Sequence, residues 1–207
     1  MKIIYFGTPK IAVKTLESLQ QEKDLEILAV VTQPDKEVGR KKVLTAPPVK
    51  VAAEDLNLKV IQPENKLQLE EALKEFKADF FVVFAYGMIF TKEVLDMPKI
   101  AAINIHTSLL PKYRGASPIQ EALKKGDSET GISVMKMDEK LDHGDIYLIK
   151  RINIEQNDTS VSLSEKLSNS SAEIMPHALQ DIASNEMNPL TQNHEEASYC
   201  KKISEFY

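Results

Sequence analysis

One stretch decides the fold of this chain: Phe80-Phe81-Val82-Val83-Phe84-Ala85. An unbroken apolar run of this length is typical of a central parallel strand that is covered on both faces. Strand patterns alternate with helix patterns on its N-terminal side. Alternation of this kind predicts an α/β fold with a doubly wound, Rossmann-like, mostly parallel sheet.

The elements that flank this strand are short. Strands are predicted at Lys2–Phe6, Leu25–Thr32, Val60–Ile61 and Ile100–Ile103, and helices after Pro9, from Pro47-Pro48 and over Leu67–Phe76. Proline is favoured in the first turn of a helix, which places the start of the second helix at the proline pair.

The pattern changes in the second half of the chain. Residues Gly131–Met137 alternate between apolar and polar, Ile146–Ile154 is rich in β-forming residues, and a charged loop separates the two runs. These runs predict antiparallel strands at an edge of the sheet. A long helix is predicted over Thr159–Ala183. We expect Pro176 to kink or interrupt this helix, because proline lacks the backbone N–H that a helix interior needs.

Composition bounds the class of protein. The chain has 207 residues, of which 43% are hydrophobic and 28% charged, which suits one globular domain with or without a tail. Its formal net charge of -5 argues against a general attraction to nucleic acid, so any RNA contact must come from a local patch. The single cysteine, Cys200, is interpreted as an incidental thiol and favours a reducing cytoplasm. We expect a cytoplasmic monomer without membrane contact, since no apolar run approaches the about 20 residues of a membrane span.

Polar residues follow the predicted strand at Ile100–Ile103. Asn104 and His106 lie two positions apart, so in a strand their side chains point to the same face. Ligands of open α/β sheets bind at the carboxyl ends of the strands. An amide donor beside an imidazole can stabilise an oxyanion and move a proton, as acyl transfer to an amine requires. Taken alone, an Asn-x-His pair is more often structural.

Other features have plainer interpretations. Gly7-Thr8-Pro9 lacks the second and third glycines of a dinucleotide loop, and the chain has no P-loop motif. Ser108 lacks the Gly-x-Ser-x-Gly context of a nucleophile. The acidic loop Asp138–Asp145 does not fit the spacing of an EF-hand, so we predict a solvated loop and no metal. The remaining histidines are interpreted as surface residues: His143, His177 and His194.

A basic cluster stands out in this acidic chain. Around Gly39 it consists of Lys36, Arg40, Lys41, Lys42 and Lys50. A charge run is more often a solvated loop, but a connection of about 12 residues between a strand and a helix exceeds the usual length. Lysine and arginine neutralise nucleic-acid phosphates, so an RNA contact is the functional alternative.

The order of these motifs resembles the folate-dependent formyltransferase family. The matching segments reach to about Tyr199 and are Met1–Pro9, Thr32–Asp35, Gly39–Lys41, Pro47–Lys50, Ala85–Gly87, Asn104–Gln120 and Met137–Asp145. The resemblance implies the formyltransferase fold, which is Rossmann-like in architecture without the usual dinucleotide.

The resemblance also implies roles for particular residues. The implied catalytic triad is Asn104, His106 and Asp142, in which the carboxylate would orient the imidazole. The implied contacts to a reduced folate are Ser108, Leu109, Leu110, Pro111, Tyr86 and Gly87. The implied contacts to tRNA are Arg40, Lys41 and Lys42.

The implied reaction transfers a formyl group from 10-formyltetrahydrofolate to the amino group of an initiator methionyl-tRNA, without a metal and without a covalent enzyme intermediate. The implied boundaries are a catalytic domain over residues 1–189 and a linker over 190–207 toward an absent C-terminal domain. Three alternatives stay open: a formyltransferase that acts on an amino-sugar nucleotide, a formyltetrahydrofolate hydrolase, and a folate-binding module without catalytic activity.

Overall fold

The computed structural model describes residues 1–202, which fall into two compact units, one of residues 1–103 and one that begins at Asn104. No helix in this part of the chain is long and apolar enough to cross a membrane. The strand at the boundary, β7 (Ala101–His106), contributes its first half to one unit and its second half to the other.

The first unit is built on a parallel sheet. Its strands are, in spatial order, β7, β6 (Phe80–Phe84), β1 (Lys2–Gly7), β2 (Glu26–Val31) and β5 (Val60–Ile61). Strand β1 pairs in parallel with both β2 and β6, and β2 pairs in parallel with β5. Strand β6 is buried at every position, as its unbroken apolar sequence predicts for a strand that is covered on both faces.

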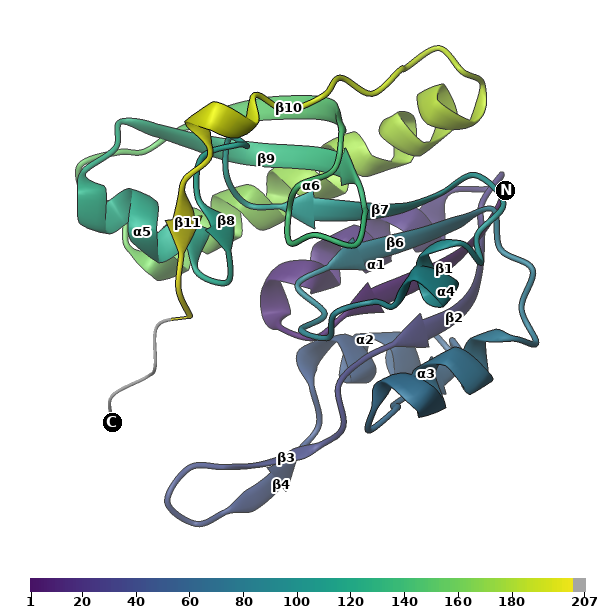
Figure 1. Ribbon diagram of the computed structural model, residues 1–207. Helices are drawn as coiled ribbons and strands as arrows, with labels where there is room; N and C mark the ends of the chain where they lie inside the picture. The colour runs from purple at the N-terminus through teal and green to yellow at the C-terminus, as the bar shows by residue number, and fades with distance from the viewer. Residues whose placement is uncertain (203–207) are drawn as a thin grey trace. The chain divides into compact units, whose positions relative to one another are not determined.

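Helices cover both faces of this sheet. They are η1 (Lys10–Ala12), α1 (Val13–Gln21), α2 (Pro48–Asp55), α3 (Lys66–Leu73) and α4 (Lys92–Leu95). Helix α1 contacts α2, and α3 contacts α4. Figure 1 shows the two pairs on opposite faces of the sheet, which confirms the doubly wound prediction. Pro48 begins α2 as expected, whereas α3 ends at Leu73 instead of continuing to Phe76.

The basic connection between β2 and α2 differs from the prediction. Instead of an irregular loop, it holds a two-stranded antiparallel hairpin of β3 (Lys36–Val38) and β4 (Val43–Thr45). Figure 1 shows this hairpin projecting from the rest of the first unit. The hairpin has no buried face, since every residue in both strands is exposed. The burial pattern that usually reveals a strand in sequence is therefore absent here.

The second unit contains the predicted antiparallel pair. Its elements are β8 (Arg114–Gly115), α5 (Pro118–Lys125), β9 (Glu129–Lys136), β10 (Ile146–Asn153), α6 (Ser160–Ala183), η2 (His194–Glu196) and β11 (Tyr199–Cys200). Strands β9 and β10 are antiparallel, and β9 lies next to β7 in the strand order. Helix α6 packs against both β9 and β10. A separate short parallel pair joins β11 to β8.

Helix α6 runs without interruption through Pro176, so the expected break at this proline is wrong. The helix begins with a capping box, because Thr159 and Ser162 each accept a hydrogen bond from the other's backbone N–H. Its buried residues include Leu163, Leu167 and Leu179, and the helix contacts β9, β10 and α5. Packing of this kind offsets the hydrogen bond that a proline removes from a helix interior.

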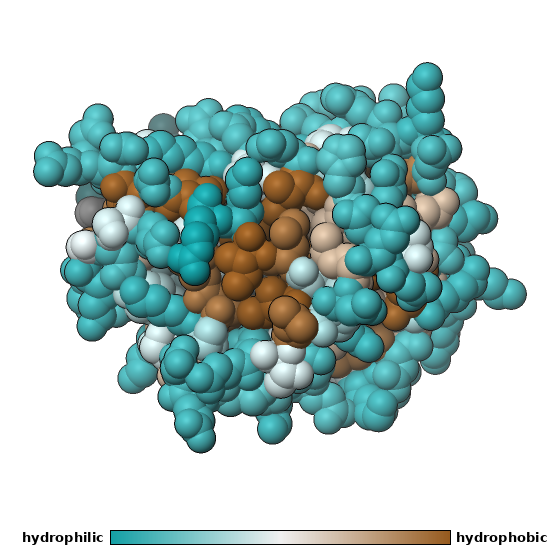
Figure 2. Space-filling view, turned by 90° about the horizontal axis from the view of Figure 1, so that it is seen from above, coloured by the Kyte–Doolittle hydropathy of each residue, from teal (hydrophilic) through white to brown (hydrophobic). Residues whose placement is uncertain are grey.

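Some apolar side chains stay at the surface. Figure 2 shows one face of the molecule, on which polar and charged side chains surround a group of apolar ones. The most exposed large apolar side chains of the second unit are Val161, Leu190 and Tyr199. Apolar atoms make up more than half of a folded protein's surface, so single exposures like these carry no functional conclusion.

The predicted division into a domain over 1–189 and a linker over 190–207 stays a prediction. Within the linker range, Leu190 bridges to Ile146, and β11 pairs with β8. Residues 203–207 of that range lie outside the described residues.

Candidate functional site

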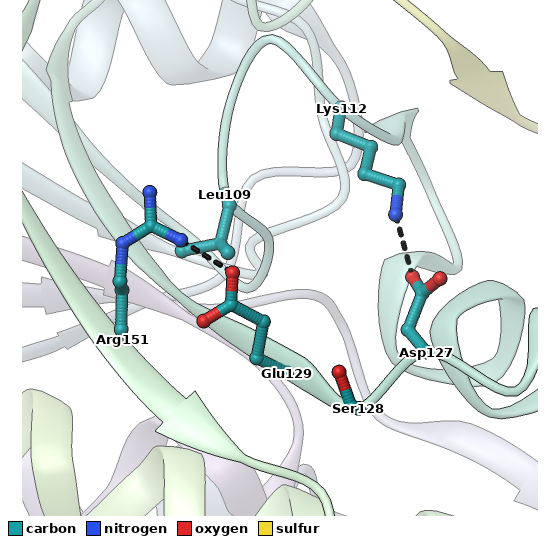
Figure 3. Close-up of a pocket in the computed structure, with 6 residues that line it drawn as sticks. All are labelled: Leu109, Lys112, Asp127, Ser128, Glu129 and Arg151. Atoms are coloured by element: carbon teal, nitrogen blue, oxygen red, sulfur yellow. Dashed lines mark hydrogen bonds and ion pairs between the residues drawn. The ribbon is translucent and has the colours of Figure 1, made fainter.

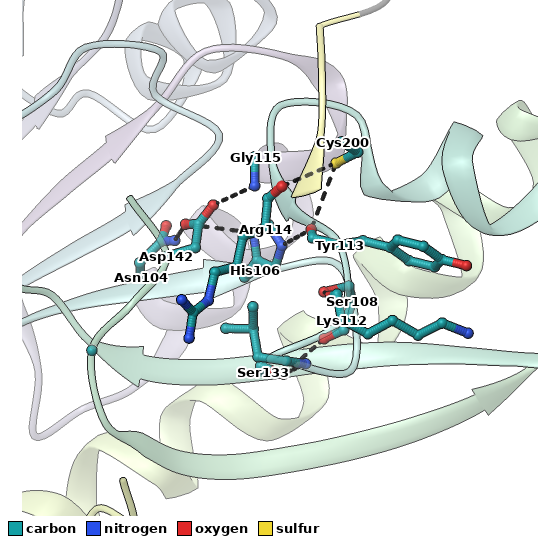
Figure 4. A network of polar contacts seen from close by, with 12 residues as sticks. Asn104, His106, Ser108, Lys112, Tyr113, Arg114, Gly115, Ser133, Asp142 and Cys200 are labelled. Atoms are coloured by element: carbon teal, nitrogen blue, oxygen red, sulfur yellow. Dashed lines mark hydrogen bonds and ion pairs between the residues drawn. The ribbon is translucent and has the colours of Figure 1, made fainter. Parts of the chain in front are cut away.

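The three residues of the implied triad come together in the second unit. Asn104 and His106 lie on the second half of β7, and Asp142 lies in the loop between β9 and β10. The Asn104 Nδ2 atom donates a hydrogen bond to Asp142 Oδ1 over 3.3 Å. The His106 Nδ1 atom lies 3.7 Å from the same oxygen. Figure 4 shows both side chains of β7 directed at this carboxylate.

The contact of the other ring nitrogen of His106, Nε2, determines the tautomer of the neutral imidazole. Nε2 lies 2.9 Å from the carbonyl oxygen of Tyr113. A carbonyl can only accept a hydrogen bond, so Nε2 carries a hydrogen and donates it. In the neutral ring, Nδ1 is therefore the unprotonated nitrogen, and it faces Asp142. The ring is 6% exposed, so few water molecules compete for this nitrogen.

The carboxylate of Asp142 is held from two sides. Oδ1 accepts from Asn104, and Oδ2 accepts from the backbone N–H of Gly115 over 2.8 Å. Asp142 has a φ of 48°, in the left-handed region, which aspartate tolerates better than most residues. Asp142 is 9% exposed, so its carboxylate is nearly enclosed by these partners.

The implied folate contacts of the second unit follow His106 directly. Ser108 is fully buried, its hydroxyl donates to the carbonyl of Lys112, and its own carbonyl accepts from the Ser133 hydroxyl over 2.7 Å. The same Ser133 hydroxyl accepts from the Leu110 backbone N–H over 3.0 Å. Leu109 and Pro111 are partly exposed. The hydroxyl of Ser108 therefore stabilises the turn, and the exposed parts of the segment lie at Leu109 and Pro111.

The other implied folate contacts, Tyr86 and Gly87, belong to the first unit. Tyr86 is 1% exposed, and its ring packs edge-on against Phe6 and Phe90. Burial raises the pKa of the Tyr86 hydroxyl, which has no hydrogen-bond partner among the described residues. Gly87 is exposed and has a φ of 89°, where a side chain would strain the backbone.

The implied tRNA contacts also lie in the first unit, at the turn of the β3–β4 hairpin. Arg40, Lys41 and Lys42 are all exposed there. Lys50, which the sequence placed in the same cluster, is instead paired with Asp35 over 2.9 Å. A hydrogen bond from Gln62, followed by one from Lys50, lowers the pKa of the Asp35 carboxyl. Lys50 is thus engaged by a carboxylate, whereas Lys42 Nζ lies 3.9 Å from Glu37 and stays exposed.

Sequence reasoning missed a polar network around the buried Arg114, the neighbour of Gly115. Arg114 is 2% exposed and hydrogen-bonds to the side chains of Gln192, His194 and Tyr199. His194 is exposed and His143 half-buried, and their rings stack with centroids 4.0 Å apart. Arg114 lies within the matching segment Asn104–Gln120, which was the available signal, but its partners lie far away in sequence.

Cys200 is a buried residue, although it was interpreted as an incidental thiol. It packs with Tyr113 and Ala122 in a small apolar cluster. Burial raises the pKa of its thiol, which disfavours the nucleophilic thiolate form. Among residues 1–202, no group of three or more His, Cys, Asp or Glu side chains is arranged to hold a metal ion.

A small pocket lies beside the folate segment of the second unit (Figure 3). It is lined by Leu109, Lys112, Asp127, Ser128, Glu129 and Arg151. Its charged side chains are paired with each other, Lys112 with Asp127 over 2.9 Å and Arg151 with Glu129. The pocket therefore presents no unpaired charge to a ligand.

Similarity to known proteins identifies the family of the chain. The profile described as "Formyl transferase" matches residues 1–179. Methionyl-tRNA formyltransferases of Mesoplasma florum and Caldicellulosiruptor saccharolyticus are 44% and 47% identical over 99% and 98% of the chain. The chain spans 65% and 66% of the length of these two relatives.

A solved structure gives the same fold. The N-formyltransferase from Helicobacter canadensis, in complex with folinic acid and dTDP-3-aminofucose, superposes with a TM-score of 0.74 at 23% identity. The match covers 98% of this chain and 71% of that one, and it confirms the predicted formyltransferase fold. With a profile that matches most of its residues, the chain belongs to the formyl transferase family.

Proposed function

We propose that this chain transfers the formyl group of 10-formyltetrahydrofolate to the amino group of an initiator methionyl-tRNA. The observation that carries the proposal is the meeting of Asn104 and His106 at one oxygen of Asp142, at 3.3 and 3.7 Å. The choice of acceptor rests on relatives of that name at 44% and 47% identity, each matched over nearly the whole chain.

The three side chains have distinct tasks in this proposal. The amine attacks the formyl carbon, the carbonyl oxygen gains negative charge, and the amine nitrogen must lose a proton. Asn104 Nδ2 is a neutral donor that can turn from Asp142 to the developing oxyanion. His106 accepts the proton at Nδ1, because Nε2 already donates to Tyr113. The proton then passes to N10 of the folate as the carbon–nitrogen bond breaks, so the enzyme ends unchanged.

Asp142 supports the histidine through this cycle. An imidazolium at His106 would face Asp142 Oδ1 at 3.7 Å, a distance that small ring rotation closes to an ion pair. Gly115 holds the other carboxylate oxygen, so the carboxylate keeps its place whether the ring is neutral or charged. No step uses Cys200, whose buried thiol is disfavoured as a nucleophile.

The reduced folate is proposed to contact Leu109, Leu110 and Pro111 of the second unit. The hydroxyl of Ser108 already donates to Lys112, so we assign this serine the task of shaping the turn beneath the ligand. Tyr86 and Gly87 are proposed as further contacts. Since the Tyr86 ring is buried, the exposed backbone at Gly87 is the accessible part of that segment.

The tRNA is proposed to contact the β3–β4 hairpin through Arg40, Lys41 and Lys42. These cations are exposed at its turn, in a chain whose formal net charge is -5. Phosphate contacts of this kind add affinity that weakens as the salt concentration rises.

The experiment that tests the proposal supplies the chain with radiolabelled 10-formyltetrahydrofolate and initiator methionyl-tRNA. The expected result is label on the methionyl amine, identified as formylmethionine after release from the tRNA. Uncharged tRNA is the matched control, because it keeps every phosphate and lacks only the acceptor amine.

Two further acceptor conditions separate the alternatives. Label on a dTDP-amino sugar in place of methionyl-tRNA would make the chain a sugar-nucleotide formyltransferase. Labelled formate released without any acceptor would make it a hydrolase. Folate binding without either product would leave a binding module, and each of these results would overturn the proposed reaction.

A further inference from the structure

Gln192 has its whole side chain engaged in hydrogen bonds. It lies between α6 and η2 and is 5% exposed. Its Nε2 donates to the main-chain carbonyl of Asp142 over 3.0 Å and to that of Gly144 over 2.7 Å. Its Oε1 accepts from Arg114 Nε over 3.2 Å and from Arg114 Nη2 over 2.7 Å. Both donors and both lone pairs of the amide are therefore used.

These bonds reach the two segments that hold the Asp142 carboxylate. One partner is the backbone of Asp142 itself, whose side chain faces His106. The other is Arg114, the neighbour of Gly115, whose N–H donates to Asp142 Oδ2. Gln192 thus ties the loop that carries the carboxylate to the strand, β8, that donates to it.

The arginine in this network depends on neutral partners. Arg114 is buried, and its side-chain acceptors are Gln192 Oε1, His194 Nδ1 at 2.8 Å and Tyr199 Oη at 3.3 Å. None of these is a carboxylate. A buried guanidinium is stable only when its N–H groups have hydrogen-bond acceptors. The two hydrogen bonds from Arg114 to Gln192 Oε1 therefore anchor the position of the guanidinium.

The segment that carries Gln192 lies outside the part of the chain that the family profile matches, residues 1–179. It nevertheless contacts the site at several points. Tyr113 donates its N–H to Ser198 Oγ over 2.9 Å, and Arg114 donates its N–H to the Ser198 carbonyl over 2.8 Å. The segment therefore contributes to the same site as the profile-matched residues.

We infer that Gln192 is a positioning residue that sets the place of Asp142 beside His106. The inference rests on the proposed function, because it deepens the role given to Asp142 there. Loss of the amide donors would free the carbonyls of Asp142 and Gly144 and let the loop shift. A displacement of about 1 Å in a catalytic group can cost up to about 100-fold in rate.

Gln192→Glu is the sharpest variant for the test. A carboxylate keeps two oxygens for the guanidinium of Arg114 but loses the N–H donors to Asp142 and Gly144. The variant therefore removes the hydrogen bonds to the Asp142 loop and keeps acceptors for Arg114. Gln192→Ala removes both, and a thermal melt reports whether each variant is folded.

Asn193→Ala is the matched control. Asn193 is the next residue in the same segment and is exposed, and its side chain accepts from the Glu195 N–H at 3.3 Å, with no bond to the Asp142 loop among the described residues. A general loosening of the segment would affect both positions, whereas loss of the bond to the Asp142 loop affects Gln192 alone.

Two readouts are measured on the full chain. The first is steady-state formyl transfer to methionyl-tRNA, in which Gln192→Glu should lower kcat about 10- to 100-fold and change both KM values less than about 3-fold. The second is amide hydrogen exchange at Gly115, followed by NMR. This exchange should accelerate in Gln192→Glu, because the Gly115 N–H bonds to Asp142 Oδ2. Asn193→Ala should match the wild type in both.

The outcomes decide the inference in each case. Wild-type kcat together with wild-type exchange in a folded Gln192→Glu would overturn it. Equal losses in Gln192→Glu and Asn193→Ala would overturn it too, since they would show a general role of the segment. If the wild-type chain forms no formylmethionine, the proposed function fails, and the exchange at Gly115 alone then decides whether Gln192 positions Asp142.

Discussion

The Nδ1 atom of His106 lies 3.7 Å from Asp142 Oδ1, whereas Nε2 of the same ring lies 2.9 Å from the carbonyl of Tyr113. Nε2 is thus a hydrogen-bond donor, and Nδ1 lies beside a carboxylate at slightly more than hydrogen-bond distance. A proton that arrives at Nδ1 would convert this contact to an ion pair. The geometry suits a group that takes up one proton and later gives it away.

Replacing His106 by alanine is expected to lower kcat by at least about 100-fold, the usual scale for losing a positioned acid–base group. Folate binding should change little, because the implied folate contacts are other residues. Steady-state kinetics and equilibrium folate binding measure the two effects. His177→Ala is the matched control, since His177 is an exposed histidine on α6. A His106→Ala chain that keeps most of its turnover would remove this residue from the chemistry.

Asn104→Ala and Asp142→Ala are expected to lower kcat about as much as His106→Ala does. Because Asn104 and His106 meet at one carboxylate oxygen of Asp142, the kcat of each double variant should be little lower than that of its worse single variant. Turnover of the three single and three double variants measures the coupling. Rate losses that multiply in the double variants would show that the residues act independently.

Binding of tRNA through the β3–β4 hairpin should weaken as the salt concentration rises. Arg40→Ala should raise the KM for methionyl-tRNA without changing folate affinity, and the difference from wild type should shrink as salt rises. Lys23→Ala is the control, because Lys23 is an exposed cation in the turn after α1. The measurement is KM for tRNA at several salt concentrations. An equal loss with a small amine as the acceptor would place Arg40 in the folate site or the fold instead.

The stability of the chain should depend on His194 below neutral pH. Desolvation by neighbouring groups, followed by the charges of His143, Arg114 and Lys140, lowers the pKa of the exposed His194 below its usual value, with Asp138 opposing. A histidine with a lowered pKa binds fewer protons folded than unfolded, so its stabilising effect is present above about pH 6.5 and is lost as the pH falls through the folded pKa. His194 Nδ1 also accepts a hydrogen bond from Arg114, which requires this nitrogen to be unprotonated.

Thermal melts between about pH 7.5 and 5 test this expectation against His194→Gln, in which an amide can still accept from Arg114 without titrating near neutral pH. The melting temperature of the wild type should fall more steeply toward acid than that of the variant. His177→Gln controls for the loss of a histidine as such. Parallel curves for wild type and His194→Gln would contradict the assigned role.

The elements that could be predicted from sequence are those in which apolar residues recur at a regular spacing or form an unbroken run. Strand β6 was predicted because nothing polar interrupts it, and β9 and β10 because apolar residues recur along them. The β3–β4 hairpin was missed because its apolar residues, Val38, Val43 and Leu44, are exposed and leave no buried face to detect. The uninterrupted α6 was missed because local proline chemistry is outweighed there by packing along the helix.

The site was predictable to the extent that it is local. The period of a strand places Asn104 and His106 on one face, and β7 does extend through both. The position of Asp142 beside them came from the family resemblance and not from spacing. Gln192 could not be predicted, because its partners are main-chain carbonyls and an arginine 78 positions away. Contacts to main-chain atoms leave no residue type that a sequence pattern could reveal.

Gly144 lies two residues after Asp142, and its carbonyl accepts a hydrogen bond from Gln192. A Cβ at Gly144 would overlap the carbonyl oxygen of Lys136, a main-chain atom that cannot rotate away. Gly144→Ala should therefore push apart the start of the β9–β10 pair, where Lys136 N–H donates to the Asp145 carbonyl over 2.8 Å. We expect the free energy of unfolding to fall by about 2 kcal/mol, the usual scale of overpacking, and kcat to fall with it.

Gly126→Ala separates this local effect from a general loss of stability. Gly126 ends α5 with a φ of 69°, and no atom lies within 4 Å of a Cβ placed there. Its substitution should cost about 1 kcal/mol through backbone strain alone. Denaturant unfolding and kcat are measured for both variants at a temperature where both are folded. Gly126→Ala should lose stability and keep its kcat, whereas Gly144→Ala should lose both, because its clash lies at the base of the loop that carries Asp142. A folded Gly144→Ala chain with wild-type kcat would show that the position of this loop does not limit turnover.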